Sequence, residues 1–481
     1  MPGPENLNLL RLFRGAALYG VSDVVFALVR FLLLAVYTRI LAPAEFGTYA
    51  IIAATLQLVC IVVPAGIPSA MMVSFRESDP RGMAALRNTS MLFLLQVCIA
   101  LGAVFFACAH TLFTGTAVSS LAFWLIAWGA SEILGMVPKM SLRFNQKIVR
   151  FSAARILRVA VMVGVLLWLV EVRAAGLAAV VISEAAAAAA ELVFCCIFDG
   201  FLPRPAPLAG MGLLLGLGLP LTAVGLGVFL NDLSDRYVVF LLLGKEANGF
   251  YAAAAKIALA GSFCAEAFNS MWLPYYFRYA QKKAFHDQEL REFSKKLVLL
   301  FGALFGFLCI VLPLLVSLRI LGRDFVSPAY RGVAAVVAPL TLAYFFKMAT
   351  YVSTPVLTFR RKILKLSAIT GTAAAINIAA NVVWCRVFGG SHLYPALTAI
   401  ALMTSLSYGV CMVWVSHDAR LFAMRDWFLS PMTLFCGALL IPAFLPLPVL
   451  LKLGLWVVLA AVLYKREFSN SNVLERLIRG Q

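Results

Sequence analysis

Charged side chains lie within long apolar stretches of this chain, and their types limit the chemistry that it can offer. Five are basic and seven are acidic: Arg30, Arg158, Arg236, Lys256, Lys347, Asp23, Glu132, Glu184, Glu191, Asp232, Asp235 and Glu266. In the middle of a membrane each charge costs on the order of 3 kcal/mol unless it is paired or faces water. Such residues therefore indicate a polar interior that binds ions or charged groups without covalent chemistry.

Spacing along the chain indicates which of these side chains lie close together. Asp23 and Arg30 share one face of the first apolar stretch, and Asp232 lies one helical turn from Arg236, close enough for an ion pair. Arg236 and Lys256 lie on either side of a short break in the apolar pattern. We expect an anionic substrate to bind at Arg30, Arg236, Lys256 and Lys347. We expect ion pairs or a coupling cation at Asp23, Asp232, Asp235, Glu184 and Glu191.

Several of these residues also fit purely structural roles. Asp232 with Arg236 could be a buried ion pair that fixes two helices. Arg158 lies about two turns from a predicted cytoplasmic end, and we expect its guanidinium to reach the membrane surface. Glu184 and Glu191 flank a run of alanines, which favours close helix packing. These two acids could bind a cation or form hydrogen bonds between helices.

Two matching segments occur, one in each half of the chain. The first reads Leu-Ala-Pro-Ala-Glu-Phe-Gly-Thr-Tyr-Ala from Leu41, and the second reads Leu-Gly-Lys-Glu-Ala-Asn-Gly-Phe-Tyr-Ala from Leu243. Each lies in a short break between two apolar stretches. The repeat predicts two similar lobes, and lobes that rock about a central site are how secondary transporters alternate access. We expect the hinges at Gly47, Tyr49, Gly249 and Tyr251.

The composition is that of a membrane protein. Of 481 residues, 63% are hydrophobic and 13% are charged, and the mean hydropathy is +0.94. A soluble fold of this composition would have no polar surface. A membrane-spanning helix needs about 20 apolar residues, and the chain supplies about fourteen such stretches. We expect an all-α polytopic membrane protein with two pseudo-symmetric six-helix lobes and two additional C-terminal helices.

The basic residues concentrate in alternate loops. They cluster near residues 76–87, 139–150, 278–296 and 360–365 and in the C-terminal tail. Because positive loops stay in the cytoplasm, this asymmetry predicts that both termini are cytoplasmic. The net charge of +18 is then a consequence of topology, with anionic lipid headgroups rather than nucleic acid as the partners of these loops.

No pattern in the sequence indicates a cofactor, a metal site or an enzyme. The ten cysteines fall within apolar stretches and form no Cys-x-x-Cys pair, and the four histidines are scattered. No phosphate-binding loop of the Walker type is present. We therefore expect a protein that is not an enzyme and uses an ion gradient, the membrane potential or the substrate gradient.

Several segments carry a family resemblance. Residues 39–49, 231–236 and 249–256, together with Asn377 and Asn381, resemble polysaccharide-biosynthesis flippases of the MOP (multidrug, oligosaccharidyl-lipid, polysaccharide) superfamily. Wzx-type O-antigen and exopolysaccharide flippases are the most similar group. The resemblance extends over nearly the whole chain.

This resemblance implies a MATE-like fold and a function. The fold would comprise an N-terminal lobe at 1–200, a C-terminal lobe at 201–428 and two helices with a tail at 429–481, with Arg30, Arg236 and Lys256 in a cationic cavity. The function would be to flip an undecaprenyl-diphosphate-linked oligosaccharide from the cytoplasmic to the periplasmic leaflet of the bacterial inner membrane. Glycan polymerase and glycosyltransferases would be the protein partners.

Three alternatives remain open from the sequence. A drug or cation antiporter of the MATE branch would depend on the buried acids more than on the bases. A lipid II flippase would share most of the features described above. A non-transporting scaffold for glycan-assembly enzymes would tolerate the loss of every buried charge.

Overall fold

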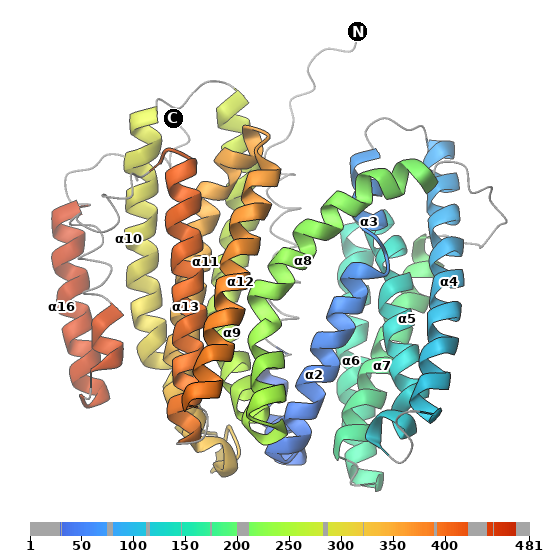
Figure 1. Ribbon diagram of the computed structural model, residues 1–481, viewed down its shortest axis with the longest axis horizontal. Helices are drawn as coiled ribbons and strands as arrows, with labels where there is room; N and C mark the ends of the chain where they lie inside the picture. Colours follow the sequence, from blue (N-terminus) through green and yellow to red (C-terminus); the bar gives the residue numbers. More distant parts are fainter. Residues whose placement is uncertain are drawn as a thin grey trace. The chain divides into compact units, whose positions relative to one another are not determined.

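The computed structural model describes most of the chain, and the described part is almost entirely helical (Figure 1). The described residues are 29, 31–74, 80–111, 116–145, 147–173, 176–199, 211–281, 287–320, 322–388, 392–421, 440–445 and 447–467. The α-helices are α2 (Pro43–Val62), α3 (Ile67–Ser74), α4 (Pro80–Thr111), α5 (Ala117–Phe144), α6 (Ile148–Arg173), α7 (Gly176–Asp199), α8 (Met211–Leu242), α9 (Lys245–Gln281), α10 (Asp287–Val311), α11 (Ala334–Phe359), α12 (Ile363–Phe388), α13 (Leu393–Asp418) and α16 (Val449–Glu467).

Ten helical segments of the described chain are long and apolar enough to cross a membrane. They correspond to α2, α4 to α8 and α10 to α13, with two of them extended by short 3-10 helices, η1 (Leu312–Ser317) and η2 (Pro328–Val333). The expectation of an all-α polytopic membrane protein is confirmed. Helix α9 falls outside this set because charged residues such as Lys256 and Glu266 lower its hydropathy. The count of fourteen stays a prediction, since parts of the first and thirteenth stretches lie outside the described residues.

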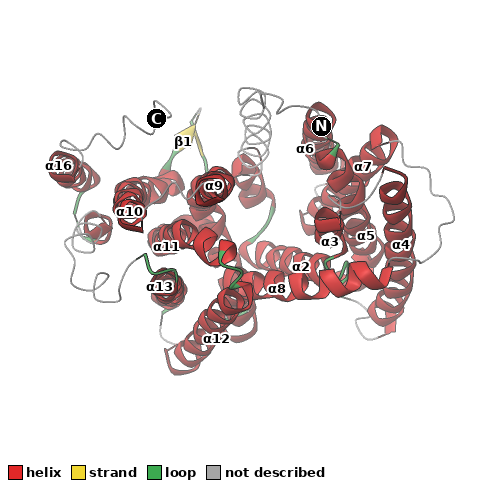
Figure 2. Cartoon of the chain, turned by 90° about the horizontal axis from the view of Figure 1, so that it is seen from above, coloured by secondary structure: helices red, strands yellow, loops and turns green. Residues whose placement is uncertain are grey.

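The chain divides into two compact units, Met1–Phe229 and Leu230–Gln481. In unit 1, α5 packs against α4 and α7, and α7 also packs against α6. In unit 2, α11 is the central helix and contacts α9, α10, α12 and α13 (Figure 2). The boundary between the units falls within α8, whereas the sequence analysis placed it before this helix, so the division into three parts stays a prediction.

Each unit has its own apolar core. In unit 1, buried side chains of α3, α4 and α5 such as Ile67, Leu94 and Val137 form a cluster with the start of α8. In unit 2, the larger cluster gathers around α11 and includes Phe305 and Val352, both fully buried. Trp456 of α16 joins this core and donates its indole N–H to the carbonyl of Ala303 in α10, at 3.1 Å.

The two matching segments have the same backbone structure. In the first, the N–H of Leu41 donates to the carbonyl of Tyr37, and the N–H of Phe46 donates to that of Ala42, both at 2.9 Å. The second repeats these bonds in the same register, from Leu243 to Val239 at 2.8 Å and from Asn248 to Gly244 at 3.2 Å. Both segments therefore end one helix and start the next.

Local sequence explains where the helix after each turn begins. Pro43 occupies the first turn of α2, where its missing N–H costs nothing, and the carboxylate of Glu45 accepts a hydrogen bond from the N–H of Ala42 at 3.1 Å. In the second segment Gly244 adopts a φ of 94°, which only glycine adopts without strain. The turns thus lie at 41–42 and 243–244, and Gly47 and Gly249 lie within the helices that follow.

A short hairpin connects η1 to η2 in unit 2. Its strands β1 (Arg319–Ile320) and β2 (Arg323–Asp324) pair antiparallel. Asp324 accepts a hydrogen bond from Arg319 at 2.9 Å and one from Arg331 at 3.3 Å. The hydrogen bond from Arg319, supported by the charge of both arginines, lowers the pKa of the Asp324 carboxyl.

Candidate functional site

Unit 1 contains a buried network of ion pairs centred on Arg158 of α6. Its guanidinium donates to Glu191 of α7 at 2.9 Å and to Glu132 of α5, and lies 3.7 Å from Glu184 of α7. Arg158, Glu184 and Glu191 are at most 5% exposed. Three helices that are consecutive in the sequence are therefore joined by one buried arginine.

Two further bases complete this network. Lys139 of α5 lies 3.2 Å from Glu191 and 3.6 Å from Glu132, and Arg155 of α6 lies 4.0 Å from Glu191. Together with Arg158 they oppose three carboxylates, so the positive and negative charges of this cluster balance. A balanced cluster removes most of the cost of burying each charge, because every charge has an opposite one within reach.

The tyrosine of the first matching segment also contacts the network. Tyr49 of α2 donates its hydroxyl to Glu184 at 3.1 Å, and its ring stacks on Trp128 of α5 with centroids 6.5 Å apart. Glu184 lies in the N-terminal half of α7, and the alanines after it are small enough for neighbouring helices to approach closely. This approach brings a carboxylate of α7 within reach of α2.

A second charged cluster lies in unit 2, around Lys347 of α11. Its ammonium group lies 3.1 Å from Asp232 of α8 and 3.4 Å from Glu266 of α9. Tyr351, one turn further along α11, donates to Glu266 at 2.8 Å. Tyr408 of α13 donates its hydroxyl to Asp232. Lys347 thus joins three helices of unit 2, as Arg158 joins three helices of unit 1.

Among the acids of unit 2 whose burial the structure describes, Asp235 is the most deeply buried, at 3% exposure. It accepts hydrogen bonds from the hydroxyl of Tyr251 in α9 and from the backbone N–H of Arg236. Tyr251 is the tyrosine of the second matching segment, so in both units this tyrosine donates to a carboxylate of another helix. The two predicted hinge tyrosines therefore lie at buried polar contacts inside their units.

The remaining polar residues of unit 2 lie on α9, α12 and α13. Lys256 is half-buried on α9, about one and a half turns beyond Tyr251. Asn377 and Asn381 of α12 are fully buried, and the amide of Asn381 donates to the side-chain oxygen of Asn377 at 3.0 Å. Thr404 of α13 donates to the same oxygen at 3.4 Å, so the asparagine pair connects two helices.

The structure differs from two expectations about ion pairs. Asp232 pairs with Lys347 rather than with Arg236, because α11 places an ammonium group directly against that carboxylate. The expectation that Arg158 reaches the membrane surface is wrong, since its guanidinium is buried among three carboxylates. Arg30 and Asp23 lie outside the described residues.

Sequence reasoning missed several members of these clusters. The distribution of basic residues places Lys139 in a cytoplasmic loop, and the sequence pattern singles out neither Arg155 nor Tyr408. The signal for Lys139 was its position inside a helix that continues to Phe144, five residues past Lys139. Within the described residues, no group of three or more His, Cys, Asp or Glu side chains is arranged to hold a metal ion.

A family model described as polysaccharide biosynthesis protein matches residues 12–280 of this chain. This match covers more than half of the sequence. The chain belongs to the polysaccharide biosynthesis protein family. No curated protein matches the sequence of this family member.

Solved structures of transporters share the fold. A lipid II flippase MurJ in an inward closed conformation has a TM-score of 0.70 and 13% identity, covering 93% of this chain and 99% of MurJ. An inward-facing multidrug resistance MATE family transporter of the MOP superfamily has a TM-score of 0.53 and 14% identity, covering 84% and 94%. A Vibrio cholerae MATE transporter, VcmN, has a TM-score of 0.55 and 12% identity, covering 86% and 97%. At these identities the likeness confirms the expected MATE-like fold.

Proposed function

We propose that this family member flips an undecaprenyl-diphosphate-linked oligosaccharide from the cytoplasmic to the periplasmic leaflet of the bacterial inner membrane. Two lobes alternate in access, and no covalent chemistry takes place. The observation that carries the proposal is the family match over residues 12–280, on a chain that has the fold of a lipid flippase and of MATE transporters. Glycosyltransferases supply the substrate, and a glycan polymerase receives it.

The main physical obstacle to flipping such a lipid is the transfer of its charged headgroup across the membrane. A diphosphate bears negative charge and cannot cross about 30 Å of hydrocarbon unaided. Fixed cations inside the protein offset its desolvation, while the lipid chain remains in the bilayer. We assign this role to Arg236 and Lys256 in the C-terminal half of the chain and to Arg30 in the N-terminal half. Lys347 has two carboxylates within 3.4 Å, so we assign it chiefly to holding α8 and α9 against α11.

The proposal predicts that Arg236 and Lys256 are needed for export but not for folding. In cells lacking the native gene, we expect Arg236→Ala or Lys256→Ala to reduce surface glycan at least tenfold at near-normal protein levels, since the lost partner is a phosphate. Arg236→Lys and Lys256→Arg should restore part of the export. Arg323→Ala, which removes an exposed arginine of the hairpin, is the matched control and should export normally.

Two outcomes would change the assignment. If both alanine variants export normally, these bases are not substrate ligands. If loss of the protein stops cell-wall synthesis rather than surface glycan, the cargo is lipid II, which also carries a diphosphate on an isoprenoid chain.

One observation favours a second candidate, a cation antiporter. Three carboxylates, Glu132, Glu184 and Glu191, surround Arg158 in unit 1, and protonation of any of them would unbalance the cluster. If variants that neutralise these acids abolish transport while variants of the bases do not, and drug resistance is the phenotype, the antiporter assignment replaces the flippase assignment.

A further inference from the structure

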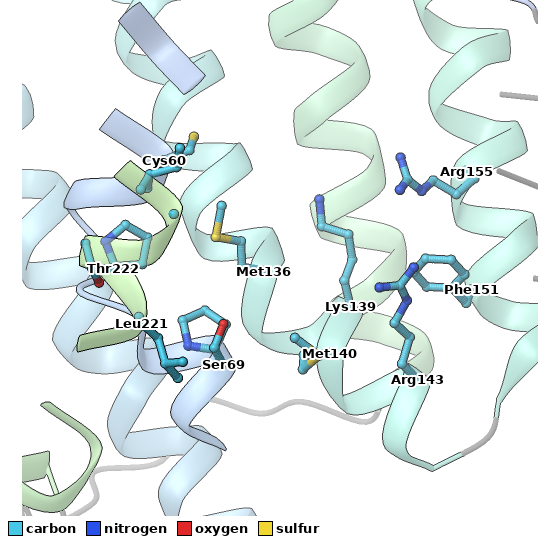
Figure 3. A pocket seen from close by; sticks show the side chains of 15 residues that line it. Cys60, Ser69, Met136, Lys139, Met140, Arg143, Phe151, Arg155, Leu221 and Thr222 are labelled. Atoms are coloured by element: carbon cyan, nitrogen blue, oxygen red, sulfur yellow. The ribbon is translucent and has the colours of Figure 1, made fainter. Parts of the chain in front are cut away.

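A cavity of about 390 Å³ lies in unit 1 and shares Lys139 and Arg155 with the Arg158 network (Figure 3). Its size is within the range of small-molecule sites, about 300–1,000 Å³. Residues of α2, α3, α5, α6 and α8 line it. Every lining residue lies within unit 1.

The wall of this cavity has two chemically different sides. One side carries Lys139, Arg143 and Arg155 around the ring of Phe151, as Figure 3 shows. The other side is mainly apolar and comprises Cys60, Ile61, Pro64, Leu221 and Gly225, with the hydroxyl of Thr222. Of the described residues that line the cavity, three are basic and none is acidic.

The two arginines are held on the same aromatic ring. The guanidinium carbon of Arg143 lies 4.6 Å from the centroid of Phe151, and that of Arg155 lies 5.6 Å from it. The ring is itself buried, at 2% exposure. Cation–π contacts of this kind hold both guanidinium groups against the same ring at the wall of the cavity. Two like charges on one ring repel, and an anion between them relieves that repulsion.

The carboxylates near this cavity lie behind its basic side and do not line it. Glu191 contacts Lys139 at 3.2 Å and Arg155 at 4.0 Å, and Glu132 lies 3.6 Å from Lys139. These contacts orient the two bases from the interior of the unit. The basic side is therefore organised before any ligand arrives, which reduces the cost of binding.

We propose that this cavity binds a diphosphate group carried on an apolar chain. The basic side takes the diphosphate through Arg143, Arg155 and Lys139, and the apolar side takes the first carbons of the chain. This proposal deepens the proposed function and rests on it. The cavity is a second subsite for the lipid-linked substrate, separate from Arg236 and Lys256. By the predicted topology it opens at the cytoplasmic end of unit 1, where the substrate is loaded.

The test measures binding of geranylgeranyl diphosphate to the purified full chain in phosphatidylcholine nanodiscs. We expect saturable binding, weakened at least tenfold in Arg143→Ala and only modestly in Arg143→Lys. Arg150→Ala is the matched control. Arg150 lies seven residues after Arg143, at the start of α6, but it donates to the carbonyl of Phe198 at 2.9 Å and does not line the cavity. Met140→Glu, which places an acid in the cavity, should also abolish binding and provides a second variant if Arg143→Ala does not fold.

Three comparisons identify the ligand chemistry. Inorganic pyrophosphate should compete weakly and geranylgeraniol not at all, because both the charge and the chain contribute. If pyrophosphate binds as tightly as the prenyl diphosphate, the cavity is a site for a free anion and the lipid part of the proposal is wrong. If phosphatidylglycerol nanodiscs displace the probe completely, the cavity is a general lipid site and the proposal is overturned.

The outcome also separates this inference from the proposed function. If Arg143→Ala and Met140→Glu bind the probe as tightly as the unaltered protein, the cavity inference is wrong and the proposed function is unaffected. If the variants lose the probe but cells lacking the protein still export their glycan, the cavity inference holds as a binding site and the proposed function fails.

Discussion

Arg158 illustrates how the chain manages charge inside a helical bundle. A single arginine in an apolar helix would be costly, but this one has three carboxylates from two other helices around it. Replacing Arg158 leaves three carboxylates with only two basic neighbours, and burying the uncompensated negative charge is costly. The network in unit 1 therefore has a structural role in addition to any role in coupling.

We predict that Arg158→Met destabilises the protein by about 3 to 5 kcal/mol, because the carboxylates of Glu184 and Glu191 lose their central partner. Thermal unfolding in detergent would measure this as a lower melting temperature. Arg150→Ala, at the exposed start of the same helix, should leave the melting temperature unchanged within error. Equal melting temperatures for both variants would show that the network does not stabilise the unit.

Spacing along one helix could not identify the partner of Asp232. The sequence offered Arg236, one turn away, whereas the structure selects Lys347, which is 115 residues away in the chain. Helical periodicity predicts which residues share a face, but the tertiary structure, which brings Lys347 of α11 to Asp232, decides which opposite charge meets that face. The sequence shows which charged residues lie in apolar helices, but not which of them pair or how deeply each is buried.

At the scale of elements, the turn between α2 and α3 crosses α8 at close range. Gly66, with a φ of 68°, lies against the carbonyl of Gly218, and a Cβ at either glycine would overlap backbone atoms of the other segment. Pro220 follows within α8, and this helix is visibly bent in Figure 1. Glycine is needed here because two backbones come into direct contact.

We predict that Gly218→Ala lowers stability by about 1 to 3 kcal/mol, since its methyl group would overlap the carbonyl of Ala65. Gly216→Ala is the matched control, because no atom of another segment lies within 4 Å of the added Cβ and alanine is the better helix former. The melting temperatures of the two variants should differ clearly. If Gly218→Ala is as stable as Gly216→Ala, the crossing is looser than described.

The sequence predicted which segments form helices and turns better than it predicted the residues at which each one begins and ends. The matching segments were recognised, and their hydrogen bonds repeat in register, because a turn that ends one helix and starts the next depends on local residues. Glycines were expected to mark the hinges, yet Gly47 and Gly249 lie inside helices and the turns precede them. Composition could not reveal this, since glycine in a helix is also selected for close packing.

At the scale of the whole molecule, the topology remains a prediction from the distribution of basic residues. Reporter fusions test it. Fusions after Arg81, Arg150 and Lys283 should report a cytoplasmic location, and fusions after Thr114 and Ser391 a periplasmic one. A reversed result at two or more of these sites would contradict the predicted orientation.

The relative importance of bases and acids separates the two transport hypotheses. We predict that Glu184→Gln with Glu191→Gln lowers export less than Arg236→Ala does, once export is divided by the amount of folded protein in the membrane. The correction is needed because both acids belong to the Arg158 network and their loss also lowers stability. The antiporter is favoured if export per folded molecule falls in the Glu184 and Glu191 variant but not in Arg236→Ala.

The most direct measurement of the central claim is lipid flipping by the purified protein. Vesicles containing the chain and an undecaprenyl-diphosphate oligosaccharide would be assayed for the rate at which the sugar becomes accessible to an external lectin. We predict time-dependent exposure with the unaltered protein and with Arg323→Ala, and at least a tenfold slower rate with Arg236→Ala combined with Lys256→Ala. No exposure above protein-free vesicles, under an imposed ion gradient or without one, would contradict the account.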